Sequence, residues 1–264
     1  MRLERWLRTR LARLRAIRYR TMFGTARVYE TLWEGSRIRV LELDGTYQSA
    51  TYLDERWCDP PFSYLQRYDL VFEAGVPVRD MCMLGGGGYA YPKHVVAHHP
   101  QARIDVVEID PRMTQIAHDH FFLDLLRSTF HTDETGRLGI IDTDALSHLR
   151  DCAARGRRYD AILNDCFAAS EPEAALVTPK AAALLHACLN PKGLYVTNVI
   201  TALEGEDASP LMELVAVLGA EFEHVMALPD ERTGPTEENN VMVVASDCQI
   251  DVPGAYRLMD RVAE

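Results

Sequence analysis

Four consecutive glycines follow a short apolar run near the middle of the chain, a combination typical of a loop that approaches a ligand. Gly85, Gly86, Gly87 and Gly88 come directly after Met81–Leu84. Because these residues have no Cβ atoms, their backbone can pass close to a bound molecule and turn sharply into a helix. The cluster also fits a plain tight turn, so its chemistry depends on what stands at the ends of the neighbouring strands.

Acidic residues stand at the ends of the next three apolar runs. Glu108 lies about 20 residues after the glycines, a spacing at which a carboxylate accepts hydrogen bonds from ribose hydroxyls. Asp110 precedes a proline and is expected to cap a helix instead. Asp144 with Ala145 follows the third run, where a carboxylate and a backbone N–H can bind adenine. Asp165 follows the fourth run, beside the expected position of the reacting end of a cofactor.

Apolar runs alternate with helical stretches beyond residue 79, and this alternation predicts an α/β fold. The expected structure is a doubly wound, mostly parallel seven-stranded sheet with helices on both faces. Ligands bind such a sheet at the carboxyl ends of its strands, where the glycines and carboxylates stand. The expected strands, of which the last two form an antiparallel edge pair, are 81–84, 104–109, 138–141, 161–163, 194–200, 224–228 and 241–245. Helices are expected notably at 111–126, 144–154 and 179–189.

A strand-rich segment precedes the α/β part, and Asp44-Gly45 within it is typical of a hairpin turn. The 264 residues are 47% apolar and 25% charged, which are ordinary values for a globular chain and exclude the disordered and fibrous classes. We predict three parts: a basic amphipathic helix over 1–20, a small N-terminal β-domain over 21–75 and a Rossmann-like domain over 76–264.

The net charge of −11 argues against broad binding to nucleic-acid phosphates. The first 20 residues depart from this average, because they hold eight arginines and one acid, Glu4. Apolar residues recur there at three- and four-residue steps, which predicts the amphipathic helix. Three roles stay open for it: docking on the acidic body or on a second subunit, anchoring on an anionic membrane surface, or organelle targeting.

The glycines, the carboxylates and the preceding hairpin together resemble the S-adenosylmethionine-binding fold of class I methyltransferases. More closely, they resemble the spermidine synthase family, over residues 38–246. Residues 43–48, Leu-Asp-Gly-Thr-Tyr-Gln, are similar to the family's L-D-G-x-x-Q, and residues 62–64 to its helix opening. The resemblance implies these cofactor-binding residues: Gln48, Gly85, Gly86, Gly87, Glu108, Asp144, Ala145 and Asp165.

The resemblance also implies which part of the cofactor each residue contacts. Gln48 contacts the methionine-like tail, and Glu108 holds the ribose. Asp144 with Ala145 holds the adenine. The implied cofactor is S-adenosylmethionine or its decarboxylated form.

Two residues are predicted to be catalytic, Asp165 and Tyr64. By resemblance, Tyr64 faces the acceptor amine and Asp165 is the acid beside the reacting nitrogen. Transfer from a sulfonium is an in-line displacement, so the protein mainly orients the reactants, and Asp165 is placed to take the acceptor's proton. Tyr64, Tyr89 and Tyr91 are predicted to line an acceptor pocket, with core packing or a lid as the alternative.

Three positions depart from the family's polyamine-binding pattern. Gly88 stands where aminopropyltransferases have an aspartate, Ala168 replaces the last acid of their D-S-S-D motif, and Leu65 replaces a common glutamine. A diamine needs carboxylates at both ends, because a buried cation without a partner is strongly unfavourable. Putrescine is therefore not the expected substrate. Residues 165–178 resemble a branch that keeps the cofactor site but not the polyamine site.

The sequence thus predicts an S-adenosylmethionine-dependent transferase, with methyl transfer to a small-molecule acceptor favoured. One alternative is an aminopropyltransferase that uses decarboxylated S-adenosylmethionine and an atypical amine. The other is a non-catalytic adenosyl-ligand-binding scaffold protein. By resemblance, a homo-oligomer, either a dimer or a tetramer, is expected.

Neither the histidines nor the cysteines predict a metal site. His118 and His120 are two residues apart on an expected helix, whereas ligand pairs need a spacing of three or four. The six cysteines include no C-x-x-C pair, so neither a zinc ribbon nor a disulfide framework is indicated. A reduced, cytoplasmic compartment is the corresponding expectation.

Overall fold

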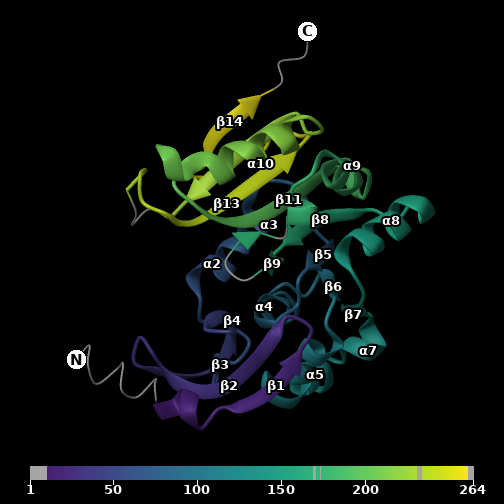
Figure 1. The fold of residues 1–264 in the computed structure, drawn as a ribbon. Coiled ribbons are helices and arrows are strands. Elements are labelled where there is room, and N and C mark those ends of the chain that lie inside the picture. The colour runs from purple at the N-terminus through teal and green to yellow at the C-terminus, as the bar shows by residue number, and fades with distance from the viewer. Residues whose placement is uncertain (1–10, 169–170, 173, 231–233, 261–264) are drawn as a thin grey trace. The chain divides into compact units, whose positions relative to one another are not determined.

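The computed structural model describes residues 11–168, 171–172, 174–230 and 234–260 (Figure 1). The chain forms two compact units. Unit 1 comprises Met1–Gln66 and Gly86–Thr143, and unit 2 comprises Arg67–Gly85 and Asp144–Glu264. The chain therefore passes from one unit to the other three times: after Gln66, within the glycine run and directly before Asp144.

The N-terminal half of unit 1 is an antiparallel four-stranded sheet in the order β1-β2-β3-β4. Its strands are β1 (Ile17–Thr21), β2 (Gly24–Trp33), β3 (Ser36–Leu43) and β4 (Thr46–Tyr52). The predicted hairpin turn between the last two strands is confirmed, because Asp44 and Gly45 both have positive φ, 44° and 99°. Such turns match the twist of the strands that they join.

The basic N-terminal segment is only partly helical in the described residues. Residues 11–14 are helical, whereas the predicted helix fails at Ile17, where β1 begins and pairs with Val28 of β2. Pairing along β2 outweighs the helical periodicity of the sequence, since propensity yields to tertiary context. Arg13 donates to the buried Glu42 Oε2 at 2.6 Å, so part of the segment docks on unit 1 itself. Residues 1–10 of the predicted helix lie outside the described residues.

The second half of unit 1 contains two parallel strands, β6 (Arg103–Glu108) and β7 (Leu138–Asp142). The named helices of unit 1 are α2 (Ser63–Gln66) in its first segment and, in its second, α4 (Ala90–His98), α5 (Pro111–His120), α6 (Leu123–Phe130) and α7 (Thr132–Thr135). The single helix expected over 111–126 is wrong. It breaks into α5 and α6 because Phe122 is left-handed at φ 62°, a conformation that interrupts a right-handed helix.

Unit 2 contains six strands in the order β14-β12-β13-β11-β8-β5, parallel from β11 to β5 and antiparallel in the rest. They are β5 (Asp80–Leu84), β8 (Tyr159–Asn164), β11 (Leu189–Thr201), β12 (His224–Pro229), β13 (Asn239–Ser246) and β14 (Tyr256–Asp260). All seven predicted strands form, and β12 pairs antiparallel with β13 as expected. The sequence prediction missed β14, which pairs with β12 and takes the edge position.

Helical segments and one short hairpin complete unit 2. The helical segments are η1 (Arg67–Asp69), α3 (Leu70–Glu73), α8 (Ala145–Arg155), η2 (Ala174–Leu176), α9 (Pro179–Ala187), η3 (Glu206–Ala208) and α10 (Ser209–Gly219). The hairpin pairs β9 (Phe167–Ala168) with β10 (Glu171–Pro172). The α/β fold class is thus confirmed.

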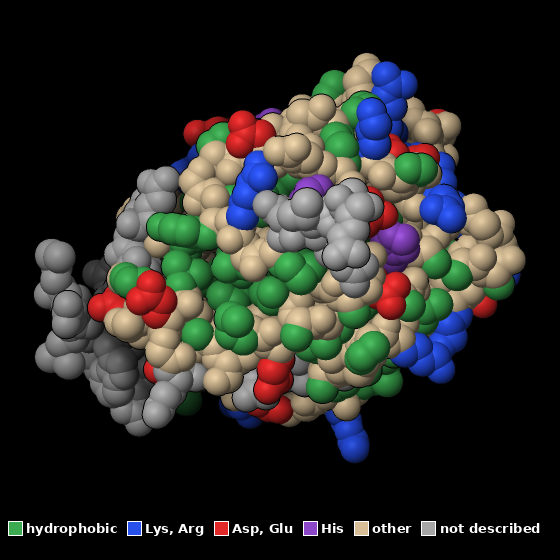
Figure 2. Space-filling view, turned by 90° about the horizontal axis from the view of Figure 1, so that it is seen from above, with side chains coloured by type: hydrophobic (Ala, Val, Ile, Leu, Met, Phe, Trp, Pro, Cys, Tyr) green, Lys and Arg blue, Asp and Glu red, His purple; other side chains and the backbone are tan. Residues whose placement is uncertain are grey.

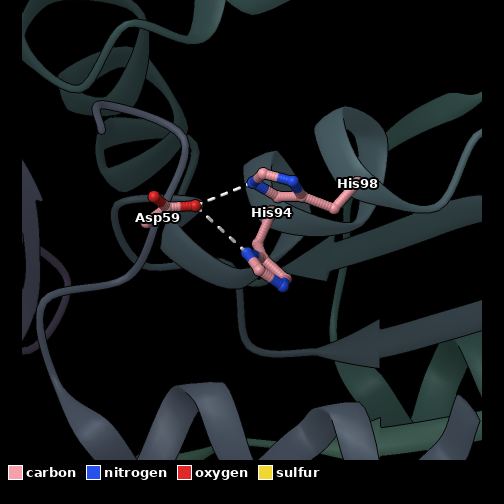
Figure 3. A group of neighbouring side chains, drawn as sticks. All are labelled: Asp59, His94 and His98. Carbon is pink, nitrogen blue, oxygen red and sulfur yellow. Dashed lines mark hydrogen bonds and ion pairs between the residues drawn. The ribbon is translucent and has the colours of Figure 1, made fainter. Parts of the chain in front are cut away.

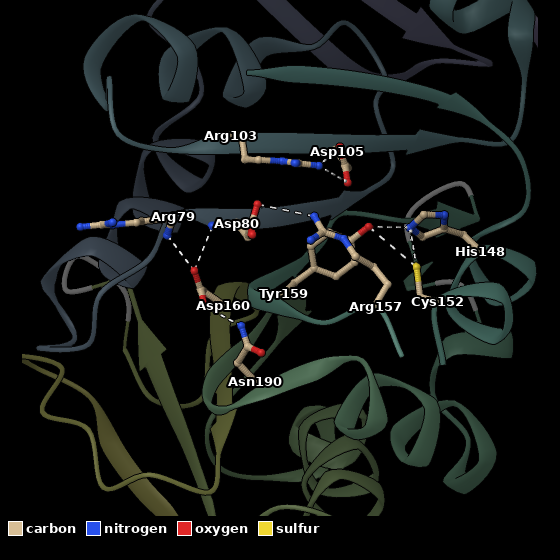
Figure 4. A network of polar contacts seen from close by, with 10 residues as sticks. All are labelled: Arg79, Asp80, Arg103, Asp105, His148, Cys152, Arg157, Tyr159, Asp160 and Asn190. Atoms are coloured by element: carbon tan, nitrogen blue, oxygen red, sulfur yellow. Dashed lines mark hydrogen bonds and ion pairs between the residues drawn. The ribbon is translucent and has the colours of Figure 1, made fainter. Parts of the chain in front are cut away.

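Polar contacts fix the beginnings of the unit 2 strands (Figure 4). Asp160 accepts from the backbone N–H groups of Arg79 and Asp80, both at 3.0 Å, and from Asn190 Nδ2 at 2.7 Å. These bonds connect β8 with the starts of β5 and β11. These bonds set the register of the three strands, and so help to position their carboxyl ends, where ligands bind such sheets.

The surface of unit 2 exposes apolar side chains beside its packed interior. Figure 2 shows such side chains gathered on one face of the molecule. Met212 on α10 and Tyr256 on β14 are each 58% exposed. No helix within the described ranges is both long enough and apolar enough to cross a bilayer.

Candidate functional site

Glu108, the last residue of β6, is a buried carboxylate that organises the glycine loop. Its Oε2 accepts from the backbone N–H groups of Gly86 and Gly87, and its Oε1 accepts from that of Asp110, each at 3.0 Å. The side chain is 7% exposed. Burial raises the pKa of Glu108 above its ordinary 4.5, whereas the three N–H groups favour the charged form and oppose that rise.

The remaining acceptor capacity of Glu108 fits a ribose. A carboxylate offers about four lone-pair positions, and the three backbone N–H groups occupy three of them. One position is left for a hydroxyl group. Gly87 has a φ of +48°, a conformation that a side chain disfavours, so the loop needs glycine there. The residues present therefore suit the nucleoside of the expected cofactor.

Asp110 caps helix α5, as predicted. Its Oδ1 accepts from Arg112 N at 2.9 Å, and its backbone is extended at the N-cap position. Its Oδ2 accepts from Met22 N at 2.7 Å, which ties the turn after β1 to the same point. Both carboxylate oxygens of Asp110 thereby hold the backbone of unit 1, in agreement with the expected capping role.

Gly88, where the resemblance to aminopropyltransferases implies an aspartate, has no room for a side chain. A Cβ built there would lie 2.6 Å from Ser49 Oγ and 3.2 Å from Phe121 Cδ1. Ser49 and Phe121 are both buried, so neither can simply swing away. The space of the family's acid is thus filled by other side chains. Gln48, half-buried on β4, lies beside this loop, because its backbone oxygen is 3.7 Å from a Cβ built on Gly87.

The three predicted pocket tyrosines separate into two groups. Tyr89 and Tyr91 are both 0% exposed, which favours the core-packing alternative over an acceptor pocket. Tyr89 OH lies 3.5 Å from Thr114 Oγ1. Tyr64 is half-buried, and its ring stacks on that of Phe62 at 6.4 Å between centroids. Of the three, Tyr64 is the one placed to meet a solute.

The Asn164-Asp165-Cys166 turn at the end of β8 is held by hydrogen bonds within unit 2. Asp165 N donates to Leu84 O at 2.9 Å, and Cys166 N donates to Asn164 Oδ1 at 3.1 Å. Tyr68 OH donates to Asn164 O at 2.6 Å. The backbone that carries the half-buried Asp165 is therefore fixed on both sides.

Gly85 is required by the same turn. A Cβ on Gly85 would lie 2.8 Å from the backbone oxygen of Asp165, and its φ is +92°. The close approach brings the end of β5 against the turn that carries the predicted catalytic acid. Gly85 and Asp165 therefore lie together in unit 2, whereas Gly86, Gly87 and Glu108 lie together in unit 1.

Asp144, predicted to hold adenine, is the N-cap of α8. Its Oδ1 accepts from Ser147 N at 2.8 Å, and both Asp144 and Ala145 are half-buried. An adenine amino group would therefore use Oδ2. Ala168, the other departure from the family pattern, lies in β9, whose side chains are outside the described part of the structure.

Sequence reasoning missed a buried lysine on α4. Lys93 is 1% exposed, and its Nζ donates to Thr51 Oγ1 at 2.7 Å and to Trp57 O at 2.9 Å. Burial lowers the pKa of Lys93 to about 7. The signal in the sequence is a lone lysine among the apolar residues that follow the glycines. If this helix lay at the surface, a lysine at this position would not be buried.

A strand, a glycine loop and a helix, followed by a buried acid at the end of the next strand, are the pattern of a nucleotide-binding, doubly wound α/β fold. Residues 70–218, more than half of the chain, match the Spermine/spermidine synthase domain. The chain belongs to this family.

The relatives carry the names of two kinds of transferase. The chain is 29% identical over 143 residues to eEF1A lysine and N-terminal methyltransferase homolog of Drosophila melanogaster, which covers 52% of this chain and 20% of that protein. It is 28% identical over 162 residues to polyamine aminopropyltransferase 2 of Hyperthermus butylicus, which covers 61% and 49%. The chain thus spans about a fifth to a half of the length of these relatives.

Among solved structures, a probable spermidine synthase from Corynebacterium glutamicum matches with a TM-score of 0.70. The two chains are 21% identical, and the match covers 89% of this chain and 81% of the other. At this identity the likeness supports the fold alone.

Proposed function

We propose that the chain is an S-adenosylmethionine-dependent transferase that moves a methyl group to a small-molecule acceptor. The packing at Gly88 carries this proposal. In aminopropyltransferases an aspartate at this position belongs to the acids that bind a diamine. Here Ser49 and Phe121 fill that space, so this point of the loop has no carboxylate for an ammonium group.

The residues around the glycine loop would hold the cofactor. Glu108 would accept from a ribose hydroxyl with its remaining lone-pair position, and Gln48, beside the loop, would contact the amino-acid tail. Asp144 Oδ2 with Ala145 N would bind the adenine. When bound, the cofactor supplies an electrophilic methyl group on a sulfonium.

Asp165 would take the proton that the acceptor releases. An amine or hydroxyl acceptor must lose a proton on transfer, and a carboxylate on a fixed backbone can accept it. Tyr64 would orient the acceptor through its half-buried ring. The support for this assignment is the rigid turn around Asp165, which Tyr68 and Leu84 hold by hydrogen bonds.

Aminopropyl transfer is the second candidate function, because the relative from Hyperthermus butylicus is named a polyamine aminopropyltransferase and Asp165 is retained. The name of the Drosophila relative suggests a protein acceptor as a further variant of methyl transfer. A dimer or tetramer, a cytoplasmic location and the division into a helix, a β-domain and a Rossmann-like domain stay proposals from the sequence.

Calorimetric titration with four ligands tests the proposal. The ligands are S-adenosylmethionine, its decarboxylated form, S-adenosylhomocysteine and methylthioadenosine. Methyl transfer predicts tighter binding of the two forms that carry the amino-acid carboxylate. Preference for the decarboxylated form and methylthioadenosine would support aminopropyl transfer instead. Binding without turnover on any acceptor would support a scaffold role, and no binding would refute the cofactor assignment.

A further inference from the structure

Two histidines of α4 and one aspartate from the loop between β4 and α2 converge in unit 1 (Figure 3). His98 Nε2 lies 2.7 Å from Asp59 Oδ1, and His94 Nδ1 lies 3.5 Å from the same oxygen. The two imidazole centroids are 4.5 Å apart. Asp59, His94 and His98 thus point their nitrogen and oxygen atoms at one small volume.

The spacing of these ligand atoms is close to that of a metal site. A tetrahedral zinc ion with bonds of about 2.0–2.1 Å holds its ligand atoms about 3.3 Å apart. The three atoms here lie within 4.8 Å of one another, so shifts of the order of 1 Å or less would bring them into that arrangement. His94 and His98 are four residues apart on one helix, which places both on the same face.

Two hydrogen bonds, one of them from the buried Lys93, hold the loop that carries Asp59 against this face of α4. Lys93 Nζ donates to Trp57 O at 2.9 Å, and Asp59 N donates to Arg56 O at 2.7 Å. These bonds fix the loop that carries Asp59 against α4, so the site is assembled before any ion arrives. Preorganisation of this kind reduces the entropy that must be lost on binding.

The site is open to solvent on one side. The side chains of His98, Asp59 and His94 are 49%, 35% and 15% exposed, so an ion can enter and water can complete its coordination. The cluster also lies at the C-terminal end of α4, where the helix dipole favours a cation.

We propose that Asp59, His94 and His98 bind a divalent transition-metal ion, with zinc preferred. Two imidazoles and one carboxylate match the donor preferences of zinc, and three protein ligands leave a position for water. The ion would connect the C-terminal end of α4 to the loop 54–59. The proposal is independent of the transfer reaction.

Titration of the chelator-stripped full-length chain with zinc chloride tests this site. One ion per chain is expected. Cobalt(II) should bind at the same site and give visible absorption bands. His98→Ala and Asp59→Asn should each weaken zinc binding at least about tenfold, since metal sites lose that much even when a supporting group is removed.

A second histidine–carboxylate pair in unit 1 provides a matched control. His118 Nδ1 lies 2.6 Å from Asp124 Oδ1 on the surface, so His118→Ala removes a comparable imidazole. This variant should bind zinc as the wild type does. Absence of one-to-one binding in the wild type would overturn the proposal. Equal affinity in His98→Ala and Asp59→Asn, or an equal loss in His118→Ala, would also overturn it. Circular dichroism of each apo variant separates lost binding from lost folding.

Discussion

Two acidic residues end parallel strands in this protein, and their surroundings differ. In unit 1, Glu108 is 7% exposed and its side-chain oxygens accept three backbone N–H groups. In unit 2, hydrogen bonds hold the half-buried Asp165 through its backbone, with Asp165 N on Leu84 O. Burial with fixed donors suits Glu108 to binding, whereas a half-buried carboxylate on a fixed backbone suits Asp165 to the proposed proton transfer.

The proposed difference between Glu108 and Asp165 is tested most directly by a substitution of Asp165. Asp165→Asn removes the proposed proton acceptor, so the turnover number is expected to fall by about 10²–10⁴-fold. The dissociation constant of the cofactor should stay nearly the same, since the side chain is proposed to act on the acceptor. Steady-state kinetics with an acceptor found by screening, together with calorimetry, measures both quantities.

A surface aspartate of the same unit serves as the control for this variant. Asp151→Asn lies on α8, where the carboxylate forms an exposed pair with Arg155 at 3.9 Å. Its turnover should equal that of the wild type. Wild-type turnover in Asp165→Asn would remove Asp165 from the mechanism.

Glu108→Ala is expected to have the next largest effect, on binding and on stability. Loss of a charged acceptor should weaken cofactor binding by about 1–3 kcal/mol, and three N–H groups would lose their acceptor. Part of the penalty is offset because a buried charge is removed, so we expect a fall in the free energy of unfolding of about 2–3 kcal/mol. Calorimetry and urea unfolding test the two effects.

Glu108→Gln separates the two roles of this carboxylate. The amide keeps the volume and one acceptor oxygen, so the stability loss should be smaller than in the alanine variant. Cofactor affinity unchanged in both variants would show that the ribose assignment is wrong.

Gly88→Asp introduces the acid that the family pattern has at this position. It tests whether packing around Gly88 excludes that acid. The new Cβ would meet Ser49 Oγ at 2.6 Å, and overpacking of this kind destabilises by about 1–3 kcal/mol. The diamine putrescine should gain affinity only when Ser49→Gly is added to make room. Thermal unfolding and calorimetry of the single and double variants measure this. A stable single variant that binds putrescine tightly would contradict the packing argument.

The sequence allowed prediction of those parts of the fold that depend on local pattern. Asp44-Gly45 predicted its hairpin turn because the turn needs positive φ, and Glu108 followed from its distance to the glycines. β14 (Tyr256–Asp260) was missed because its residues do not alternate clearly and it is ordered by pairing with β12. The helix expected to reach residue 20 failed because β1 pairs with β2.

Side-chain environments that depend on distant residues could not be predicted in the same way. Tyr89 and Tyr91 are of a residue type that suits a pocket and a core equally, and only their burial decides between the two. Asp59 and His94 are 35 residues apart in the sequence. Their proximity depends on how the loop before Phe62 packs on α4, a contact that neither spacing nor periodicity encodes.

The pH dependence of cofactor binding is the smallest expected effect, and it tests the state of Glu108 directly. Burial raises the pKa of Glu108 above 4.5, so its carboxylate becomes protonated at a higher pH than an exposed glutamate does. Protonation leaves one fewer lone pair for the ribose. The affinity for S-adenosylhomocysteine should therefore fall as the pH is lowered from neutral toward the ordinary glutamate pKa of 4.5.

The raised pKa of Glu108 gives the stability of the ligand-free chain the opposite pH dependence to that of cofactor binding. A carboxyl group whose pKa is higher in the folded state stabilises the fold fully below its unfolded pKa, near 4.5, and loses this contribution as the pH rises through the folded pKa. Glu108→Gln cannot titrate and should show neither dependence. The affinity of this variant could instead fall as steeply as that of the wild type when the pH is lowered. Another group would then control binding, and Glu108 would not change its protonation state across the range.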